Sequence, residues 1–262
     1  MKKILITGAN SYIGTSFETY IQQYAENYQL DTVDMIDGSW RDKDFSEYDV
    51  VYHVAGIAHQ KECKENVDLY YKVNRDLAVD VAKKAQEEGV KQFIFLSSMS
   101  VYGKEEGVIT KETLPVPKSH YGISKLQAEQ GILVHQSENF RIAVLRPPMV
   151  YGEGCKGNYQ TLVKIAEKLP IFADYKNVRS MVEIGVLCSF VKNLIDEESA
   201  GLFFPQNKEY VCTCKMIQSI AQKSGKNFKL TKLFNPAIWI LKTFTRKGKK
   251  AFGNLVYADD LR

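Results

Sequence analysis

The start of the chain constrains the fold most, because an apolar run leads into a glycine-containing turn and then into a helical pattern. Residues 3–7 form the run, which ends at Gly8 and is typical of a buried parallel strand. Apolar residues then recur at helical spacing from Phe17 to Tyr24. Strand, turn and helix in this order predict a dinucleotide pyrophosphate site at the helix N-terminus. The candidate cofactor-binding residues are Gly8, Asn10, Ser11, Tyr12, Ile13 and Gly14.

An acidic residue after the second predicted strand supports the same site. Asp34 lies about twenty residues beyond Gly14, where a carboxylate accepts hydrogen bonds from the adenosine ribose and repels a 2′-phosphate. The sequence therefore favours NAD over NADP, with Asp37 as the alternative acid, while Arg41 leaves NADP open. Trp40 either stacks on adenine or packs in the core.

Length and composition limit the classes of protein that remain. The 262 residues, 45% hydrophobic and 25% charged, suffice for one large α/β domain with a smaller lobe. A net charge of +4 and one basic cluster at residues 246–250 do not indicate nucleic-acid binding. Five cysteines without disulfide spacing predict a reducing compartment, the cytoplasm, and Cys212 and Cys214 lack the partners of a metal site. No stretch reaches the ~18 apolar residues of a membrane span.

A repeating strand and helix pattern predicts a doubly wound, Rossmann-type parallel sheet. Further apolar runs lie at residues 49–56, 90–96 and 140–145, with a helical pattern at residues 69–88 and another from Tyr121. Beyond residue 157 the rhythm is less regular, which predicts a smaller, interleaved C-terminal substrate-binding lobe. We expect residues 1–168 to form the NAD(P)-binding domain and residues 169–262 mainly to form the lobe, with some elements returning to the main sheet.

Small and polar residues follow the predicted strands, at the edge where open α/β sheets bind ligands. His53 and His59 are interpreted as structural histidines, and Asn74 would pin the neighbouring strands. A hydroxyl within residues 97–103 can share a substrate oxygen with Tyr121. The positions where backbone would approach the cofactor are Val54, Ala55 and Gly56.

Two segments of the predicted lobe carry distinctive chemistry. Residues 175–182 would bring Asn177 and Arg179 to a ligand. Residues 236–244 are apolar and are followed by basic residues. We expect them to form a helix that covers the core of the lobe, with binding to a membrane surface as the alternative.

Tyr121 and Lys125 are four residues apart, so one face of a helix would present both side chains. A cation within a few ångströms favours the phenolate and lowers the tyrosine pKa from its usual value of about 10. We therefore expect Tyr121 to transfer a proton near neutral pH.

In this order, the motifs resemble the extended short-chain dehydrogenase/reductases, the NAD-dependent epimerase/dehydratase family. The resemblance rests on the glycine turn, Asp34, the two serines before Val101-Tyr102-Gly103, the Tyr121 helix, and Arg146-Pro147-Pro148. The segment around Asn158 and that around Arg179 are similar to short bacterial nucleotide-sugar 4-epimerases and 4-ketoreductases of surface-polysaccharide pathways.

The resemblance implies a role for each site residue. Tyr121 would be the acid/base on the sugar C4 oxygen, Ser98 would orient that oxygen, and Lys125 would lower the tyrosine pKa and bind nicotinamide ribose. A hydride would move between C4 and the nicotinamide, and Pro147 would contact the cofactor. Arg179 would contact the nucleotide diphosphate. The implied substrate-binding residues are Ser98, Ser100, Tyr121, Met149, Asn158, Asn177 and Arg179.

The resemblance also narrows the reaction. Met99 and Ser100 stand where 4,6-dehydratases of the family place an acid pair, so dehydration is not expected. A UDP-hexose 4-epimerase and a UDP-4-keto-6-deoxy-sugar 4-reductase use the same three catalytic residues, and both stay open. The alternative from another class is a non-catalytic dinucleotide-binding sensor, although sensors usually lose the tyrosine or lysine. A homodimer is expected through the helices around Leu77 and Tyr121.

Overall fold

The computed structural model describes residues 1–58, 62–155 and 157–261; His59 lies outside this part of the chain. Two compact, discontinuous units make up the fold. Unit 1 comprises Met1–Gly103, Pro115–Pro148 and Ile184–Pro205, and unit 2 comprises Lys104–Leu114, Met149–Glu183 and Gln206–Arg262.

The unit boundary differs from the one predicted at residue 168. The chain leaves unit 1 after Pro148, because β7 (Met149–Tyr151) pairs with β9 (Met181–Glu183) inside unit 2. Residues 184–205 then return to unit 1, in keeping with the expected return of some elements to the main sheet.

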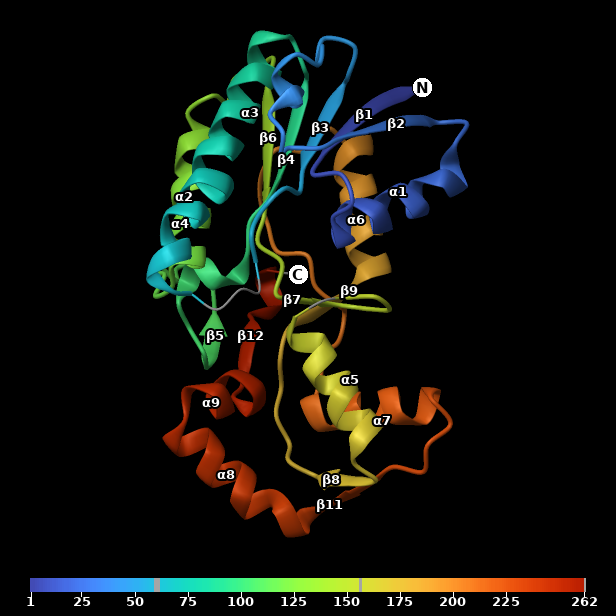
Figure 1. The fold of residues 1–262 in the computed structure, drawn as a ribbon, viewed down its shortest axis with the longest axis vertical. Helices are drawn as coiled ribbons and strands as arrows, with labels where there is room; N and C mark the ends of the chain where they lie inside the picture. The colour runs from blue at the N-terminus through green and yellow to red at the C-terminus, as the bar shows by residue number, and fades with distance from the viewer. Residues whose placement is uncertain (59–61, 156, 262) are drawn as a thin grey trace. The chain divides into compact units, whose positions relative to one another are not determined.

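Unit 1 is built on a six-stranded parallel sheet with the order β10-β6-β4-β3-β1-β2 (Figure 1). Because β1 lies between β2 and β3, the strand order reverses there, and the topological switch point lies at the carboxyl ends of β1 and β3. The strands are β1 (Lys2–Thr7), β2 (Tyr28–Val33), β3 (Val50–His53), β4 (Gln92–Leu96), β6 (Arg141–Leu145) and β10 (Gly201–Phe203).

Helices cover both faces of this sheet (Figure 1). On one face, α1 (Tyr12–Ile21) lies beside α6 (Ile184–Asp196), and on the other α3 (Leu77–Glu87) lies beside α4 (His120–Leu133). Fully buried apolar side chains fill the layer under α3 and α4. The doubly wound, Rossmann-type arrangement predicted from the sequence is therefore confirmed.

The helix predicted over residues 69–88 is interrupted. It consists of α2 (Val67–Tyr71), a π-helical segment Lys72–Asp76 and α3. The wider π turn carries Asn74, whose side chain is fully buried. The π turn changes the helical register, and it leaves the polar side chain of Asn74 in the protein interior.

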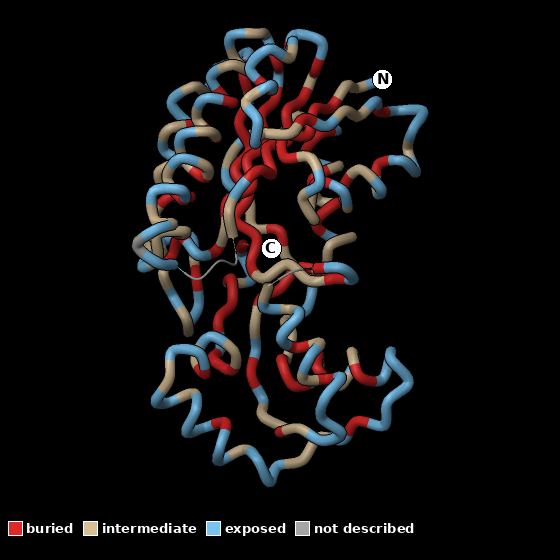
Figure 2. Tube along the Cα trace, viewed as in Figure 1, coloured by how far each residue is buried: buried red, intermediate tan, exposed pale blue. Residues whose placement is uncertain are grey.

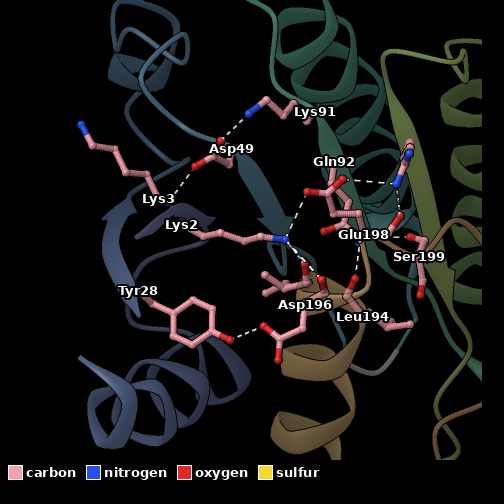
Figure 3. Close-up of polar contacts among 12 residues, drawn as sticks. Lys2, Lys3, Tyr28, Asp49, Lys91, Gln92, Leu194, Asp196, Glu198 and Ser199 are labelled. Atoms are coloured by element: carbon pink, nitrogen blue, oxygen red, sulfur yellow. Dashed lines mark hydrogen bonds and ion pairs between the residues drawn. The ribbon is translucent and has the colours of Figure 1, made fainter. Parts of the chain in front are cut away.

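A polar network closes the amino end of the sheet, opposite the edge that binds ligands (Figure 3). Lys2 donates from Nζ to the Ile195 carbonyl (2.6 Å) and pairs with Glu198 (3.2 Å). The buried amide of Gln92 donates to the Leu194 carbonyl (2.8 Å) and the Ser199 carbonyl (3.0 Å). These contacts hold the end of α6 against β1 and β4.

The described residues of unit 2 form three two-stranded parallel sheets and four α-helices. One apolar cluster of unit 2 joins α5 and α7 around Leu162, Met181 and Ile217. The elements not yet named are β5 (Gly107–Ile109), β8 (Ile171–Ala173), β11 (Lys229–Thr231), β12 (Leu255–Tyr257), α5 (Asn158–Lys168), α7 (Thr213–Lys223), α8 (Asn235–Phe244) and α9 (Arg246–Phe252). Among the helices of the described chain, none is both long and apolar enough to traverse a bilayer.

Candidate active site

The glycine turn after β1 has the geometry of a close backbone approach. Gly8 has a φ of +116°, and a Cβ there would lie 2.8 Å from the Ala55 nitrogen. The N–H groups of Gly8 and Ala9 both donate to the Val33 carbonyl (3.0 and 3.1 Å). The turn is therefore fixed against the ends of β2 and β3, at the switch point.

Ser11 stands where the usual G-x-x-G-x-x-G turn has its middle glycine, and it caps α1. Its Oγ accepts a hydrogen bond from the Gly14 N–H (3.1 Å). The hydroxyl proton is not used in this bond and could be donated to a phosphate. Asn10 precedes the cap with a φ of +63° and is exposed, while Tyr12 and Ile13 open the first helical turn. This turn suits an anion, because the N-terminus of a helix carries positive partial charge.

The acidic candidates follow β2 directly. Asp34 Oδ1 accepts from the Ile36 N–H (2.8 Å), and Asp34 follows Val33, whose carbonyl holds the glycine turn. Asp37 accepts from both the hydroxyl (2.7 Å) and the backbone N–H (3.0 Å) of Ser39, and these bonds lower the pKa of its carboxyl. Asp37 stabilises the next turn, and ribose binding by Asp34 stays a prediction.

A pocket of about 420 Å³ lies beside this segment, between residues 35–41, the π-helical turn and the start of α3. Trp40 lines it but is only 2% exposed and belongs to the apolar cluster under α3 and α4. The guanidinium of Arg41 lies over its ring, 4.6 Å from the centroid. The packing alternative for Trp40 is thus what the structure shows, and stacking on adenine stays a prediction. Glycine turn, acid and pocket together fit an adenine dinucleotide.

The two candidate catalytic hydroxyls, those of Ser98 and Tyr121, lie at the carboxyl end of β4 and the start of α4. Ser98 caps the short 3-10 helix Met99–Tyr102, accepting from the Ser100 N–H (3.1 Å), and its hydroxyl lies close enough to the Tyr121 phenol to lower the pKa of that group. Gly122 permits this approach, because a Cβ there would lie 2.6 Å from the Ser100 carbonyl oxygen. The Ser100 side chain itself is exposed.

Lys125 is held at the same edge, with 4% of its surface exposed. Its ammonium donates to the Leu96 carbonyl (2.8 Å) and lies 4.7 Å from the centre of the Phe95 ring. Burial lowers the pKa of Lys125 to about 8, although the nearby Glu129 carboxylate opposes this shift. The pKa of Lys125 is therefore only about one unit above neutral pH.

The expected lowering of the Tyr121 pKa is wrong for this structure. Burial raises the pKa of Tyr121 and the neighbouring Tyr70 adds to this, while the hydrogen bond from Ser98 opposes it. Lys125 directs its ammonium to the Leu96 carbonyl instead. In this state Tyr121 is a protonated phenol, suited to donate a proton.

Asn74 connects the cofactor edge to the catalytic helix. Its amide accepts from the Ile57 N–H (2.7 Å) and donates to the Ile57 carbonyl (3.1 Å) and to Ser124 Oγ (3.2 Å). A Cβ at Gly56 would lie 3.0 Å from Asn74 Oδ1 and 3.2 Å from Lys125 Nζ. Asn74 thus pins the segment after β3 to α4, next to Lys125.

The remaining cofactor-binding candidates of unit 1 form hydrogen bonds through their backbone. The Val54 and Ala55 N–H groups donate to the Thr7 carbonyl (3.1 and 2.9 Å), and the Pro147 carbonyl accepts from the Met99 N–H (2.9 Å). His53 is fully buried, contacts the Thr7 hydroxyl (2.8 Å), and has its pKa lowered to about 3 by burial and by Lys125. It is a neutral core histidine, as the sequence indicates.

The predicted substrate residues at 149, 158, 177 and 179 all lie in unit 2. Asn177 is 4% exposed and exchanges two hydrogen bonds with Thr213, from Nδ2 to Oγ1 (3.0 Å) and from the Thr213 N–H to Oδ1 (2.9 Å). Met149 packs against the apolar cluster of α5 and α7, and Asn158 is exposed at the start of α5. Ligand binding by these three residues stays a prediction.

The positive charge of Arg179 is partly buried, which suits this side chain to binding an anion. Its Nη1 donates to the Gly253 carbonyl (2.8 Å), and it forms no ion pair with a carboxylate in the described chain. Burial lowers the pKa of the guanidinium, and Glu105 and Glu106 offset this only in part. A bound anion would relieve the same desolvation cost.

Comparison with known proteins identifies the family of the chain. The model of the NAD dependent epimerase/dehydratase family matches residues 4–179. The chain belongs to this family. It is 31% identical to a UDP-glucose 4-epimerase of Vibrio cholerae over 248 residues, which cover 84% of this chain and 75% of that protein.

Solved structures share the fold of this epimerase/dehydratase family member. A UDP-glucuronic acid 4-epimerase from Bacillus cereus, in complex with NAD, has a TM-score of 0.70 and 21% identity, covering 98% of this chain and 89% of that one. A dTDP-4-dehydrorhamnose reductase from Clostridium acetobutylicum has a TM-score of 0.71 and 23% identity, covering 87% and 82%.

Sequence reasoning missed a buried ionic network behind the catalytic helix of this family member. Arg146 donates to both oxygens of Glu129, from Nε (3.0 Å) and Nη2 (2.6 Å), and from Nη1 to the Tyr102 hydroxyl (2.8 Å). Ser97 also donates to Glu129. The available signal was spacing, because Glu129 follows Lys125 by one helical turn.

Asn74→Leu is expected to weaken NAD binding by roughly tenfold and to destabilise unit 1 by about 1–3 kcal/mol, because the Ile57 backbone groups lose their buried partner. Calorimetric titration with NAD and urea unfolding measure the two effects. Gln86→Leu is the control, since Gln86 makes equivalent amide bonds to His135 (both 2.8 Å). It should lose stability and keep its NAD affinity; equal losses of affinity in both variants would contradict a positioning role for Asn74.

Proposed function

We propose that the protein is an NAD(P)-dependent nucleotide-sugar epimerase or reductase that acts at the sugar C4 by hydride transfer. The observation that carries the proposal is the closeness of the Ser98 hydroxyl to the Tyr121 phenol, on the same helix as the buried Lys125 and at the carboxyl edge of the parallel sheet. A proton donor and a cation at this edge are what the reduction of a carbonyl requires.

The residues divide the work around the C4 oxygen. Tyr121 would give its proton to this oxygen in the reductive direction and take it back in the oxidative one, and Ser98 would hold the oxygen in line with the phenol. Bound NAD would supply the acceptor or donor of the hydride. The ammonium of Lys125 would stabilise the phenolate that remains after proton donation.

NAD is favoured over NADP on the position of Asp34. Asp34 follows Val33, whose carbonyl holds the glycine turn, and from there its carboxylate would accept hydrogen bonds from a ribose diol and repel a 2′-phosphate. Asp34→Ala is expected to narrow the preference for NAD over NADP by about tenfold, measured as the ratio of the two dissociation constants. Asp37→Ala, the matched loss of one carboxylate on the same segment, should leave that ratio within about twofold; the reverse outcome would assign the ribose to Asp37.

We propose Arg179 as a ligand of the nucleotide diphosphate, because a planar guanidinium matches two phosphate oxygens. The UDP-glucose and UDP-glucuronic acid epimerases that resemble this chain suggest a UDP-linked substrate. We also propose a homodimer through α3 and α4. A cytoplasmic location is proposed as well, because the five cysteines are free, as expected in a reducing compartment.

One experiment separates the candidate reactions. The protein is incubated with UDP-hexoses and, separately, with a UDP-4-keto-6-deoxy sugar plus NADH or NADPH, and the products are followed by NMR. Isomerisation without net use of nicotinamide identifies a 4-epimerase, and stoichiometric oxidation identifies a 4-reductase. Binding of NAD without either reaction would favour the non-catalytic sensor.

A further inference from the structure

The helix α8 carries apolar side chains on its exposed side. Figure 2 shows most of its length in the colour of exposed residues. Sequence analysis expects this helix to cover the core of the lobe, and that expectation is wrong for most of its apolar residues. We call the following set the apolar patch: Leu233 (78% exposed), Phe234 (42%), Trp239 (57%), Ile240 (53%), Leu241 (41%) and Phe244 (75%).

An ordinary surface helix buries its apolar side chains, whereas α8 exposes most of them. Ile238, its one buried residue, packs with Ala173 and Phe252 inside unit 2. Ile240 and Phe244 are four residues apart, so both lie on one stripe, and both are more than half exposed. A soluble surface helix would present polar residues on such a stripe, so the patch is fitted to an apolar environment.

The helix is fixed to unit 2. Lys242 pairs with Glu106 (2.9 Å), and Thr245 caps α9 by accepting from the Gly248 N–H (2.9 Å). Gly248 lies so close to α8 that a Cβ there would clash with the Leu241 carbonyl oxygen. The patch and α9 therefore form one platform with fixed geometry.

Basic residues border the patch. Arg246 pairs with Glu105 (3.1 Å), but Lys247, Lys249 and Lys250 form no ion pair with another residue of the described chain. Three uncompensated positive charges thus stand within two helical turns of Phe244. This charge would repel a second copy of the same face.

We propose that α8 and α9 seat the protein on an anionic membrane surface, with the apolar patch in the interfacial layer and the α9 lysines against acidic headgroups. Apolar and aromatic side chains flanked by lysines are the features that interfacial helices use. The negative potential of an anionic leaflet is complementary to the α9 charge and attracts each nearby basic residue. The surface is independent of the proposed catalytic function.

The test measures binding of the full chain to vesicles of phosphatidylglycerol and phosphatidylcholine by co-sedimentation. We expect binding to the mixed vesicles, little binding to pure phosphatidylcholine, and weakening with added salt. Ile240→Glu with Phe244→Glu should reduce the partition coefficient by roughly tenfold or more. Lys247→Gln, Lys249→Gln and Lys250→Gln should each reduce it by about fivefold.

Trp239 supplies an internal reporter, because the other tryptophan, Trp40, is buried. Its emission should shift to shorter wavelength on the mixed vesicles, and Trp239→Phe should remove the shift. Leu114→Glu is the matched control, since Leu114 is 77% exposed in unit 2 outside the patch; its partitioning should equal that of the parent chain.

Three outcomes would overturn the proposal. The parent chain fails to bind anionic vesicles, the Ile240→Glu and Phe244→Glu variant binds as well as the parent, or the parent self-associates through this face. The last outcome would appear as a lower sedimentation coefficient of that variant without any vesicle binding. Circular dichroism of each variant verifies its fold.

Discussion

Tyr121→Phe is expected to lower kcat by about 10²–10⁴-fold and to leave NAD affinity unchanged, because only the proton donor is lost. Phenylalanine keeps the ring that meets Tyr70 edge-on, with 6.5 Å between ring centres, and removes the hydroxyl that lies near Ser98. The measurement is turnover of a UDP-sugar at saturating substrate, together with calorimetric titration of NAD.

Tyr71→Phe is the control for this substitution. Tyr71 lies on α2 and its hydroxyl contacts His120 Nδ1 (2.9 Å), one residue before Tyr121. Its kcat should stay within about threefold of the parent. A Tyr121→Phe enzyme that retains a tenth or more of the parent kcat would exclude the phenol as the proton donor.

Ser98→Ala tests the same phenol through pH. The hydrogen bond from Ser98 lowers the pKa of Tyr121 against the effect of burial, so its loss should raise that pKa further. In the oxidative direction the phenolate is the base, and the rising limb of the rate against pH should therefore move to higher pH. A limb that stays in place would assign it to another group.

Most of the sheet of unit 1 could be predicted from the sequence because its central strands, β1, β3, β4 and β6, are largely apolar runs. Lys2–Thr7 and Gln92–Leu96 agree with their predicted ranges within two residues. Parallel strands buried on both faces leave this pattern in any sequence. The same regularity places Ser98 and Tyr121 at one edge, where the structure brings them into contact.

Other features depend on tertiary contacts that no local pattern records. The π-helical turn at Lys72–Asp76 forms where Asn74 meets Ile57 and Ser124, which are distant in sequence. The paired strands of unit 2 are only three residues long, and the main part of the smaller lobe begins at Met149 because β7 pairs with β9. Spacing alone placed the boundary twenty residues later, at the end of α5.

The sign of the Tyr121 pKa shift was also outside the sequence. Spacing shows that Lys125 shares a helical face with Tyr121, but it does not show burial or the carbonyl that Lys125 contacts. Desolvation of a buried phenol competes with the field of a nearby cation, and only coordinates decide which effect is larger.

Glu129→Gln is expected to lower the free energy of unfolding by about 3–5 kcal/mol, because it leaves the Arg146 guanidinium as an uncompensated buried charge. The two side chains are 3% and 8% exposed, and their shortest contact is 2.6 Å. Thermal and urea unfolding of the parent and the variant measure the loss. Glu87→Gln is the control, because Glu87 pairs with Lys83 at 3.8 Å with both side chains about 60% exposed; it should change stability by less than about 0.5 kcal/mol.

The double variant Glu129→Leu with Arg146→Met distinguishes a lost charge pair from a lost shape. Removing both charges also removes both desolvation costs, so the double variant should recover most of the stability that Glu129→Gln loses. Lys125 would still lose the carboxylate that opposes the lowering of its pKa, so that pKa should fall further below about 8 in both variants. A double variant that is stable but has low activity at neutral pH, and regains activity at lower pH, would show that the network keeps Lys125 protonated. An equal loss of stability in the single and double variants would show that Glu129 contributes packing and not charge compensation.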